Sequence, residues 1–431
     1  MQIAKPLTLS VGPRYTSPLF RFPGSFHPPL VSSLIEAHPR ATVVGDPMVG
    51  SGTTAVMAVA MGRKAIVNDI DPLSCLITRA KTSPVNPNRL ESLVEDVISA
   101  VGPIGYRACV PITPANALRS MESVTPFRIP INVYHWFHPT VARDIARCLM
   151  EVHRMRGSLR AAEWDAVLAI VAATIRRVSK ADPRTVSGLE VTSVWRGKLA
   201  KGLRFNLAAQ LRDRTMVLVQ GYRDMQRIKG LGKAHIMNGS ALQWYDLCIN
   251  AGALPQLQIT SPPYMSAIEY ARRHKLENQW LGLVAPENYA EFSRKFFGAK
   301  YRISATHSCE AVPPEAVSAV VRRLTGQRRA GAEVEQYFLD ALAWLGELRR
   351  VAAETGPISN TYIVVGPSTT QGQVIDTPEL IAIIAKRVGF TVVSARTHGI
   401  INQRMQYPTK NGVRIRTETV LRMKPDKGVP N

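Results

Sequence analysis

The segment from Ala41 to Asp69 constrains the fold of this chain more than any other part of its sequence. Ala41 to Gly45 form a short β-branched run that ends in a glycine-rich turn, and Thr53 to Met61 favour a helix because they are rich in Ala and Met. Lys64 to Asn68 predict a second buried strand, which ends at the acidic Asp69. This succession is typical of the opening of a parallel α/β sheet.

The α/β pattern stops after this opening and resumes much later in the chain. Between about Lys81 and Lys233, Pro-rich stretches at 82–88 and 103–130 lead into helices expected at Thr140–Arg156 and Leu159–Lys180. We therefore expect a doubly wound, mostly parallel sheet built from residues 1–80 and 234–431, with a largely helical insertion at 81–233. Further strands are expected at His235–Leu242, Leu257–Thr260, Asn360–Gly366, Thr391–Ala395 and Thr417–Met423, and helices at Ala316–Glu354 and Thr377–Val388.

The chain is strongly basic, and half of its excess positive charge lies in the insertion. It has 54 Lys and Arg against 32 Asp and Glu, a net charge of +22, and Thr140 to Ala234 alone hold an excess of 11. Such an excess predicts attraction to polyanions, nucleic acid first, although a ribosome-associated or membrane-surface protein would share it. The insertion is either a helical surface module or a DNA-contacting region, since clustered cations gain affinity by releasing counterions from phosphates.

The cysteines and the apolar runs indicate a soluble protein of a reducing compartment. The cysteines form no CxxC pair, which argues against a zinc site or a disulfide framework. The N-terminus lacks the apolar core of a signal peptide, and the longest apolar run, Ala166 to Ile175, is far shorter than the roughly 20 residues that span a bilayer. We expect a cytoplasmic protein with no metal and no membrane partner. The five cysteines are Cys75, Cys109, Cys148, Cys248 and Cys309.

The glycine-rich segment Asp46–Thr54 (DPMVGSGTT) predicts a ligand-binding loop between the first strand and its helix. Glycines are needed there because the backbone must turn tightly and approach a ligand closely. Gly50 to Ala55 also satisfy the loose dinucleotide pattern GxGxxA, so a NAD-dependent enzyme stays an alternative on this motif alone. The segment is not a P-loop, because Ser51 stands where lysine is required. The candidate binding residues are Asp46, Pro47, Gly50, Ser51, Gly52, Thr53 and Thr54.

An acidic residue at the end of the second strand is the natural partner of a nucleoside bound by this loop. In open α/β sheets, such an acid accepts hydrogen bonds from ribose hydroxyls. Asp69 directly ends the strand and is expected to accept both hydroxyls of an adenosine ligand, while Asp71, two residues further on, is the alternative.

The segment Thr260–Tyr264 (TSPPY) carries the strongest chemical signal. Two successive prolines fix φ near about −65° and remove two N–H donors, so the loop is rigid and presents carbonyl oxygens. An exocyclic amino group has two N–H donors to satisfy, and the Ser261 hydroxyl and the Pro262 carbonyl can accept from them. Tyr264 offers a flat face for an extruded base, a contact worth about 1–3 kcal/mol. The alternative is an ordinary Pro-rich turn; on the first interpretation the catalytic residues are Ser261, Pro262, Pro263 and Tyr264.

Together these loops resemble the amino-methyltransferase family of DNA modification enzymes, in which a DPF-type GxGxT loop binds S-adenosylmethionine and an (S/D/N)PP(Y/F) loop is catalytic. The resemblance covers roughly residues 20–80 and 235–425, and Met48 replaces the usual aromatic residue. Phe22–Pro28 is similar to an additional cofactor-contacting segment, and Asn238–Ser240 to the segment that contacts adenine. The resemblance thus adds Phe26, His27, Asn238, Ser240 and Thr260 to the expected cofactor-binding residues.

The resemblance implies the Rossmann-like fold of S-adenosylmethionine-dependent methyltransferases, with 1–80 as the cofactor-binding half and 234–431 as the catalytic half. The insertion 81–233 would then be a target-recognition region. This order is similar to that of the class in which target recognition separates the two halves, although here the insertion precedes the adenine-contacting segment. The implied partner is double-stranded DNA.

The implied reaction is methylation of an amino group on a base flipped out of the duplex, without a covalent enzyme intermediate. No Pro-Cys dipeptide, which supplies the thiolate of C5-cytosine methylation, occurs in the chain. Ser261 resembles the SPPY form common in N4-cytosine enzymes, whereas Asp or Asn there is commoner in N6-adenine enzymes. N4 of cytosine, in one specific sequence as in restriction-modification, is therefore expected, and N6 of adenine is the alternative.

Other interpretations can be weighed against the same residues. An RNA methyltransferase would carry an RNA-binding appendage, and a NAD-dependent oxidoreductase would leave the TSPPY loop unexplained. A non-catalytic DNA-binding relative would be expected to have lost Ser261, Tyr264 or Asp69, and all three are present. Glu269–Lys275 is either a clamp for target-strand phosphates or a solvated helix face. The sequence identifies no recognition site, companion nuclease or oligomeric state.

Overall fold

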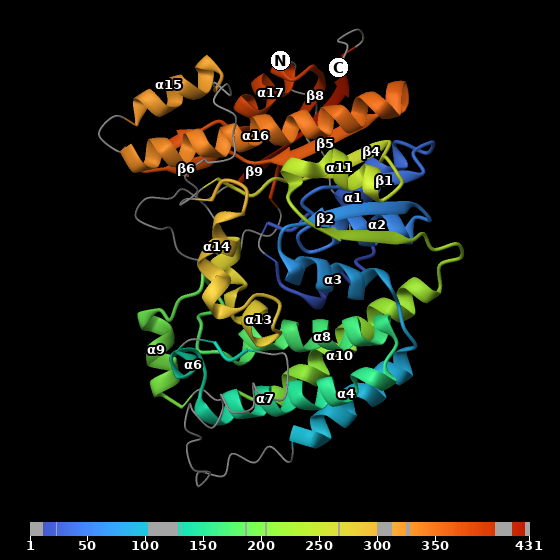
Figure 1. Ribbon diagram of the computed structural model, residues 1–431, viewed down its shortest axis with the longest axis vertical. Coiled ribbons are helices and arrows are strands. Elements are labelled where there is room, and N and C mark those ends of the chain that lie inside the picture. The colour runs from blue at the N-terminus through green and yellow to red at the C-terminus, as the bar shows by residue number, and fades with distance from the viewer. Residues whose placement is uncertain are drawn as a thin grey trace.

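A seven-stranded sheet forms the centre of the protein in the computed structural model (Figure 1). Its strand order is β3-β2-β1-β4-β5-β9-β8, and the first five of these strands run parallel while β9 is antiparallel to both of its neighbours. The structure describes residues 12–22, 24–101, 128–130, 132–185, 188–202, 205–265, 268–299, 313–324, 328–400 and 416–426. The strands are β1 (Val43–Asp46), β2 (Lys64–Asp69), β3 (Ala234–Asn238), β4 (Leu257–Thr260), β5 (Asn360–Val365), β8 (Phe390–Gly399) and β9 (Thr417–Pro425), and β6 (Ser368–Thr370) pairs with β7 (Gln373–Ile375) in a separate two-stranded sheet.

The order of the strands reverses between β1 and β4, and this reversal places the site. The chain goes outward from β1 to β2 and β3, and from β4 to β5 on the other side. Ligands bind beyond the carboxyl ends of parallel strands at such a switch point. The strands end there with Asp46, Asp69, Asn238 and Thr260, all predicted site residues. The predicted doubly wound, mostly parallel sheet of the Rossmann-like methyltransferase type is confirmed.

Both faces of the sheet are buried, as parallel sheets require. In β5, Tyr362 and Val364 pack with α1 (Pro28–Glu36) and α2 (Thr53–Ala60) on one face. Ile363 and Val365 alternate with them and pack on the opposite face. The helices on that second face are α11 (Trp244–Asn250), α15 (Glu315–Arg323), α16 (Arg328–Thr355) and α17 (Thr377–Arg387).

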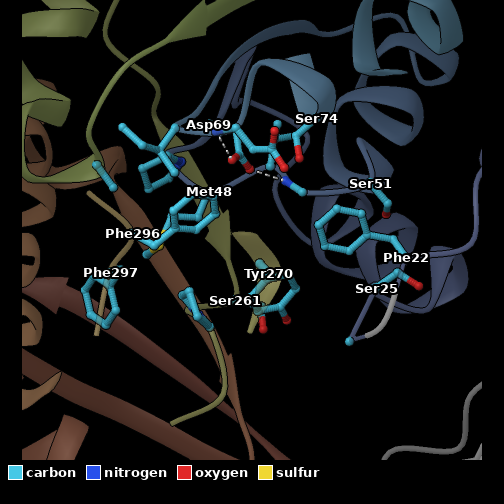
Figure 2. A pocket seen from close by; sticks show the side chains of 18 of the residues that line it. Phe22, Ser25, Met48, Ser51, Asp69, Ser74, Ser261, Tyr270, Phe296 and Phe297 are labelled. Atoms are coloured by element: carbon cyan, nitrogen blue, oxygen red, sulfur yellow. Dashed lines mark hydrogen bonds between the residues drawn. The ribbon is translucent and has the colours of Figure 1, made fainter. Parts of the chain in front are cut away.

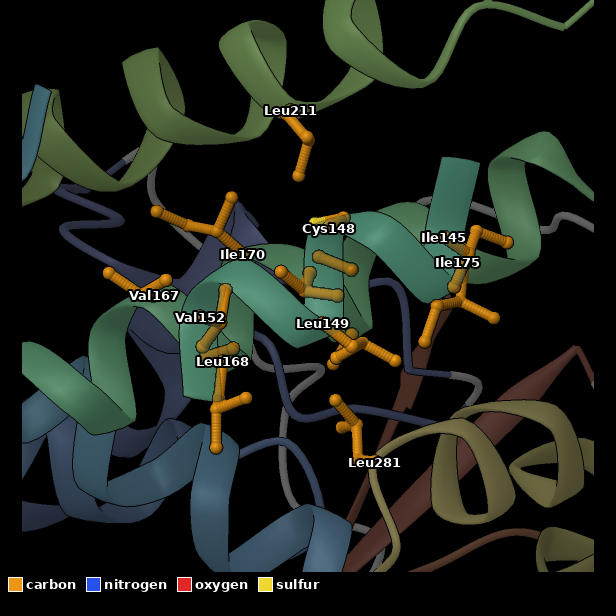
Figure 3. Close-up of a cluster of buried hydrophobic side chains, with 14 of the residues drawn as sticks. Ile145, Cys148, Leu149, Val152, Val167, Leu168, Ile170, Ile175, Leu211 and Leu281 are labelled. Carbon is orange, nitrogen blue, oxygen red and sulfur yellow. The ribbon is translucent and has the colours of Figure 1, made fainter. Parts of the chain in front are cut away.

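A helical bundle extends from the β3 side of the sheet, below α3 (Pro72–Thr82) in Figure 1. The described residues of 81–233 form helices and no strand. The bundle has a closely packed apolar core that includes Leu149, Ile170 and Leu211 (Figure 3), and α3 and α13 (Lys275–Trp280) contribute to the same core. Its helices are α4 (Pro87–Val101), α6 (Val133–Trp136), α7 (Pro139–Arg154), α8 (Ala161–Ile175), α9 (Ser193–Ala200) and α10 (Leu207–Gln226).

Most predicted elements are present with shifted ends. The helices expected at Thr140–Arg156 and Leu159–Lys180 are α7 and α8, and the single helix expected at Ala316–Glu354 is divided into α15 and α16. Helix α4 was not predicted, because the prolines at 82–88 indicated a loop. Pro87 instead occupies the first turn of α4, where a missing N–H costs nothing. Of the second Pro-rich stretch, only 128–130 is described.

The remaining helices surround the carboxyl ends of the strands. Helix α12 (Tyr270–Arg273) follows the TSPPY loop, and α14 (Tyr289–Arg294) lies between the sheet and the bundle in Figure 1. No helix in the described part of the chain is long and apolar enough to cross a membrane.

Candidate functional site

A cavity opens at the carboxyl ends of β1, β2 and β4, where the strand order reverses (Figure 2). It holds about 880 Å³ of empty space, its open mouth included. Binding sites for small organic ligands commonly span about 300–1,000 Å³. Both loops singled out in the sequence contribute to its wall. The predicted site residues that line it are Phe26, Pro47, Gly50, Ser51, Thr53, Asp69, Asp71, Ser240, Ser261 and Pro263.

The other predicted site residues do not line the cavity. Asn238 is typical of them, because its Nδ2 donates hydrogen bonds to the main-chain oxygens of Asp69 at 2.8 Å and Ile70 at 3.1 Å. It therefore fixes the end of β2 against β3 and does not line the cavity. The predicted residues outside the lining are His27, Asp46, Gly52, Thr54, Asn238, Thr260, Pro262 and Tyr264.

The glycine-rich loop has the backbone conformation that its glycines suggest. Gly50 and Gly52 have φ angles of +50° and +83°, in the left-handed region that side chains disfavour. A Cβ on Gly50 would lie 3.1 Å from the Phe22 ring, and one on Gly52 would lie 2.8 Å from Oγ1 of Thr78. The loop thus needs glycine at both positions to turn into the N-terminus of α2.

Asp69 joins the end of β2 to this loop. Its carboxylate accepts hydrogen bonds from the main-chain N–H of Gly50 at 2.8 Å and of Asp71 at 2.9 Å. Burial, reinforced by the nearby charge of Asp71, raises the pKa of Asp69 to about 7. The residue is 9% exposed and lines the cavity, so its carboxylate faces the ligand space (Figure 2).

Asp71 also lines the cavity, but its carboxylate is taken up by protein groups. Oδ1 accepts from the N–H of Leu73 at the start of α3 and from Nδ2 of Asn278, both at 3.0 Å. Oδ2 bonds with Nδ1 of His274 at 2.8 Å. Both carboxylates have protein partners, but Asp71 makes three such hydrogen bonds and is 2% exposed, whereas Asp69 accepts two and is 9% exposed. Asp69 is therefore better placed than Asp71 to meet ribose hydroxyls.

Two buried polar residues that the sequence did not indicate hold the wall together. Nδ2 of Asn68 donates to the carbonyls of Pro47 at 3.0 Å and Gly239 at 2.9 Å, and so ties the glycine-rich loop to the Asn238–Ser240 segment. Lys81, at the end of α3, donates from Nζ to the carbonyl of Ser51 at 2.7 Å. Burial lowers the pKa of Lys81 to about 7.

Asp46 ends β1 beneath the glycine-rich loop and is 1% exposed. Its Oδ1 accepts from the N–H of Met48 at 3.1 Å, which shapes the turn after the strand. Burial raises the pKa of Asp46 to about 7. Asp46 therefore supports the loop from behind and has no surface in the cavity.

The hydrogen bonds of the TSPPY loop show which of its acceptors are already occupied by protein donors. Oγ of Ser261 donates to the carbonyl of Val364 in β5 at 2.8 Å, and the Tyr337 hydroxyl donates to the carbonyl of Pro263 at 2.9 Å. Among the described residues, none donates to the carbonyl of Pro262. The lone pairs of Ser261 and the Pro262 carbonyl are therefore left for another donor.

Tyr264 occupies a more enclosed place than a stacking surface would have. It is 8% exposed and does not line the cavity, and its hydroxyl donates to the carboxylate of Glu418 in β9. Gly24 packs directly against its ring, because a Cβ on Gly24 would lie 2.9 Å from Cε2 of Tyr264. The aromatic ring that faces the cavity near Ser261 is that of Tyr270 (Figure 2).

The aromatic part of the wall was largely missed from the sequence. Phe22 stacks on Tyr270 with ring centroids 5.5 Å apart, and Phe296 and Phe297 enter the cavity from the segment after α14 (Figure 2). Phe22 lies in the Phe22–Pro28 segment, which could have indicated it. No motif surrounds Phe296 and Phe297, so their place depends on tertiary packing alone.

Both interpretations of the Glu269–Lys275 segment were wrong for two of its residues, Arg273 and His274. Arg273 and His274 are 2% and 1% exposed. Nη1 of Arg273 donates to the carbonyl of Thr185, and His274 bonds with Asp71, so these residues join the segment after the TSPPY loop to the bundle and to the start of α3. They can serve neither as a phosphate clamp nor as a solvated face, because hydrogen-bonded partners bury them.

The sheet order and the glycine-rich loop at its switch point define the class of fold, that of S-adenosylmethionine-dependent methyltransferases. No family model matches the chain. Over 80 residues, 18% of each protein, the chain is 34% identical to the type II methyltransferase M.MvaI of Kocuria varians. Over 79 residues, 18% of this chain and 15% of the relative, it is 33% identical to the type II methyltransferase M.MjaII of Methanocaldococcus jannaschii.

These matches cover less than a fifth of either relative's length. Among solved structures, the rRNA methyltransferase AviRa of Streptomyces viridochromogenes aligns with 96% of this chain and 88% of its own. That alignment has 11% identity and a TM-score of 0.28, too low to support a structural argument. The partial sequence similarity and the sheet order together support a methyltransferase.

Proposed function

We propose that this chain is an S-adenosylmethionine-dependent DNA methyltransferase that methylates an exocyclic amino group of a flipped base, with N4 of cytosine favoured. The observation that carries the proposal is the hydrogen bond from Ser261 Oγ to the Val364 carbonyl at the cavity wall. A serine hydroxyl has one proton to donate and two lone pairs that accept. Because its proton is held by Val364, Ser261 can only accept from an incoming N–H group.

An amino group with two N–H donors needs a second acceptor, and we assign this role to the main-chain carbonyl of Pro262, a buried residue between the lining residues Ser261 and Pro263. Tyr337 already donates to Pro263, whereas no described residue donates to Pro262. Ser261 and the Pro262 carbonyl would therefore hold the two N–H groups and orient the nitrogen lone pair. The same two acceptors stabilise the positive charge that develops on the nitrogen as it is alkylated.

The residues around the glycine-rich loop fit S-adenosylmethionine. The Asp69 carboxylate would accept from the ribose hydroxyls, and the left-handed Gly50 lets the backbone approach the ligand. Oγ of Ser74 is buried at the cavity and has no hydrogen-bond partner in the described structure, so a polar ligand atom would satisfy it. When bound there, S-adenosylmethionine supplies a methyl group activated by a sulfonium.

The described cysteines argue against methylation at a ring carbon, which needs a thiolate nucleophile. Burial raises the pKa of Cys148 to about 12 and also raises the pKa of Cys75 and of Cys248. None of the three lines the cavity. An amino group, which attacks directly and needs only acceptors, is the better substrate for this site.

Duplex DNA is the proposed substrate because of the distribution of charge. The net charge of +22 favours a polyanion, and residues 140–234, which the bundle helices occupy, hold half of it. The type II methyltransferases that share sequence similarity with this chain agree with such a substrate.

The test compares modified bases in genomic DNA from cells that express the wild type, Ser261→Ala or Ser158→Ala. Ser158 is an exposed serine in the turn between α7 and α8 and serves as the matched control. N4-methylcytosine in one short sequence context, present with the wild type and the control and absent with Ser261→Ala, is the expected result. N6-methyladenine in place of it would overturn the choice of base, and no modified base at all would overturn DNA methylation.

A further inference from the structure

Helix α9 (Ser193–Ala200) lies on the surface of the bundle without a single buried residue. Helices in folded proteins gain most of their stability by packing an apolar face, and α9 instead leaves its polar side chains accessible to a partner. Its exposed side chains include Arg196 and Lys198, and Lys201 follows directly. The stretch from Val191 to Gly202 contains no acidic residue.

An open groove separates α9 from α12 and from the start of α13. It holds about 1,000 Å³, and its charged lining residues are Arg196, Arg272, Lys275 and one acid, Glu190. Arg272 is exposed and pairs with Glu269 at 3.6 Å. Trp136 also lines the groove and adds an aromatic surface to it. An excess of cations around an aromatic ring favours the binding of a nucleic acid, which carries both phosphates and planar bases.

The groove adjoins the candidate active site through a single turn of helix. Tyr270, the first residue of α12, lines the cofactor cavity, while Arg272, two residues later, lines the groove. Because residues two positions apart project from nearly opposite sides of a helix, a strand whose phosphates lie in the groove would pass on the other side of α12, about 10 Å from the cavity. A base that rotates out of the duplex about its own backbone could reach Ser261 from there.

We propose that this groove, together with the exposed side of α9, binds the phosphate backbone of the duplex beside the flipped base. The inference rests on the proposed function and assigns its DNA-contacting surface to particular residues. Duplex DNA is the proposed occupant because its dense negative charge, one per about 1.7 Å of axis, attracts a groove with three cations and one acid beside the further cations of α9. An acidic protein surface would not bring a base to the neighbouring cavity.

The test measures the affinity for a short DNA duplex at several salt concentrations. The variant Arg196→Ala/Lys198→Ala/Lys201→Ala removes three cations from α9 and its end without touching a buried residue. The matched control, Arg227→Ala/Lys229→Ala/Lys233→Ala, removes three exposed cations from the turn between α10 and β3. That turn lies at the opposite end of the bundle from α9 (Figure 1).

We expect the α9 variant to bind the duplex about 10- to 100-fold more weakly near 100 mM salt, with a salt dependence reduced by about two to three released counterions. The control should lose less than about threefold, and both should bind S-adenosylmethionine as the wild type does. Equal losses in both variants, or none in the α9 variant, would overturn the proposal. A duplex RNA bound more tightly than DNA through the same residues would overturn the choice of partner.

The proposed function is tested separately by the modified bases in genomic DNA. If no base is methylated but the α9 variant alone loses affinity for the duplex, the groove is a DNA-binding surface and the methyltransferase assignment fails. If methylation occurs and the α9 variant methylates DNA as the wild type does at limiting DNA, the assignment holds and the groove proposal fails.

Discussion

The carboxylate of Asp71 and Nδ1 of His274 form a hydrogen bond of 2.8 Å between residues that lie 203 positions apart in the chain. Both side chains are 2% exposed, and Asn278 donates to the same carboxylate at 3.0 Å. Asp71 begins α3 beside the cofactor side of the cavity, and His274 directly follows α12, after the TSPPY loop. This pair therefore holds the two halves of the candidate site in one relative position.

Replacing His274 by alanine should lower the stability of the fold. The buried Asp71 carboxylate would lose a donor and a cavity would remain, so we expect a loss of about 2–4 kcal/mol in the free energy of unfolding. Urea denaturation measures this loss. His135→Ala, at an exposed histidine, should change the same quantity by less than about 0.5 kcal/mol. Equal stabilities of the two variants would contradict the structural role of the pair.

The affinity for S-adenosylmethionine should depend on pH through Asp69. Because burial raises its pKa to about 7, Asp69 is protonated below that pH and a full acceptor above it. Binding should therefore tighten between pH 6 and pH 8. Asp69→Asn should bind about 10- to 100-fold more weakly at pH 8, since hydrogen bonds to a charged group are worth about 1.5–3 kcal/mol.

Calorimetric titration at several pH values checks this, with Asp46→Asn as the control. The pKa of Asp46 is also raised to about 7, but Asp46 does not line the cavity. The control should keep the pH dependence that Asp69→Asn loses. If only the Asp46 variant loses the pH dependence of binding, that dependence arises from the support that Asp46 gives to the loop, and a direct contact by Asp69 is contradicted.

The sequence allowed much of this site to be predicted, because its central residues lie in short contiguous segments whose residue types are required by the local backbone geometry. The Asp46–Thr54 loop needs left-handed glycines, and the TSPPY loop needs rigid carbonyls, so both are visible as short patterns. Their place at one edge of the sheet followed from the strands that precede them. The sheet was predictable for the same reason, since buried parallel strands are short apolar runs.

The rest of the site depends on contacts between distant segments, which no local pattern encodes. Asn68 is a strand residue whose amide connects two loops, and Lys81 ends a helix beneath Ser51. Phe297 reaches the cavity because it packs on Tyr337 and Trp344 of α16. In the sequence, Arg273 and His274 have the composition of a solvated helix, and only tertiary packing buries them.

Two substitutions of Tyr264 should separate the role of its ring from that of its hydroxyl. Tyr264→Phe loses the hydrogen bond to the half-buried carboxylate of Glu418 and should lower the free energy of unfolding by about 1–2 kcal/mol. It keeps the ring, so methyl transfer should stay within about threefold of the wild type. Tyr264→Ala should lower kcat/KM for DNA by about 10- to 100-fold, because loss of the buried ring leaves a cavity beside Gly24 and lets the TSPPY loop shift from its position at the cavity wall. Equal loss of activity in both variants would assign the function to the hydroxyl and Glu418.

The buried Lys81 should make the stability of the fold depend on pH and should support the glycine-rich loop. Burial lowers its pKa from 10.5 to about 7, so between these values the unfolded chain holds a proton that the folded chain lacks. The free energy of unfolding therefore gains a contribution that rises with pH across this range, by at most about 1.4 kcal/mol per pH unit. Lys81→Met, which keeps the packing, should remove that contribution, as urea denaturation at pH 7 and pH 9 would show.

The Lys81→Met variant also loses the donor to the Ser51 carbonyl, so it should bind S-adenosylmethionine about tenfold more weakly at pH 7. Wild-type affinity in this variant would contradict a role of Lys81 in holding the glycine-rich loop.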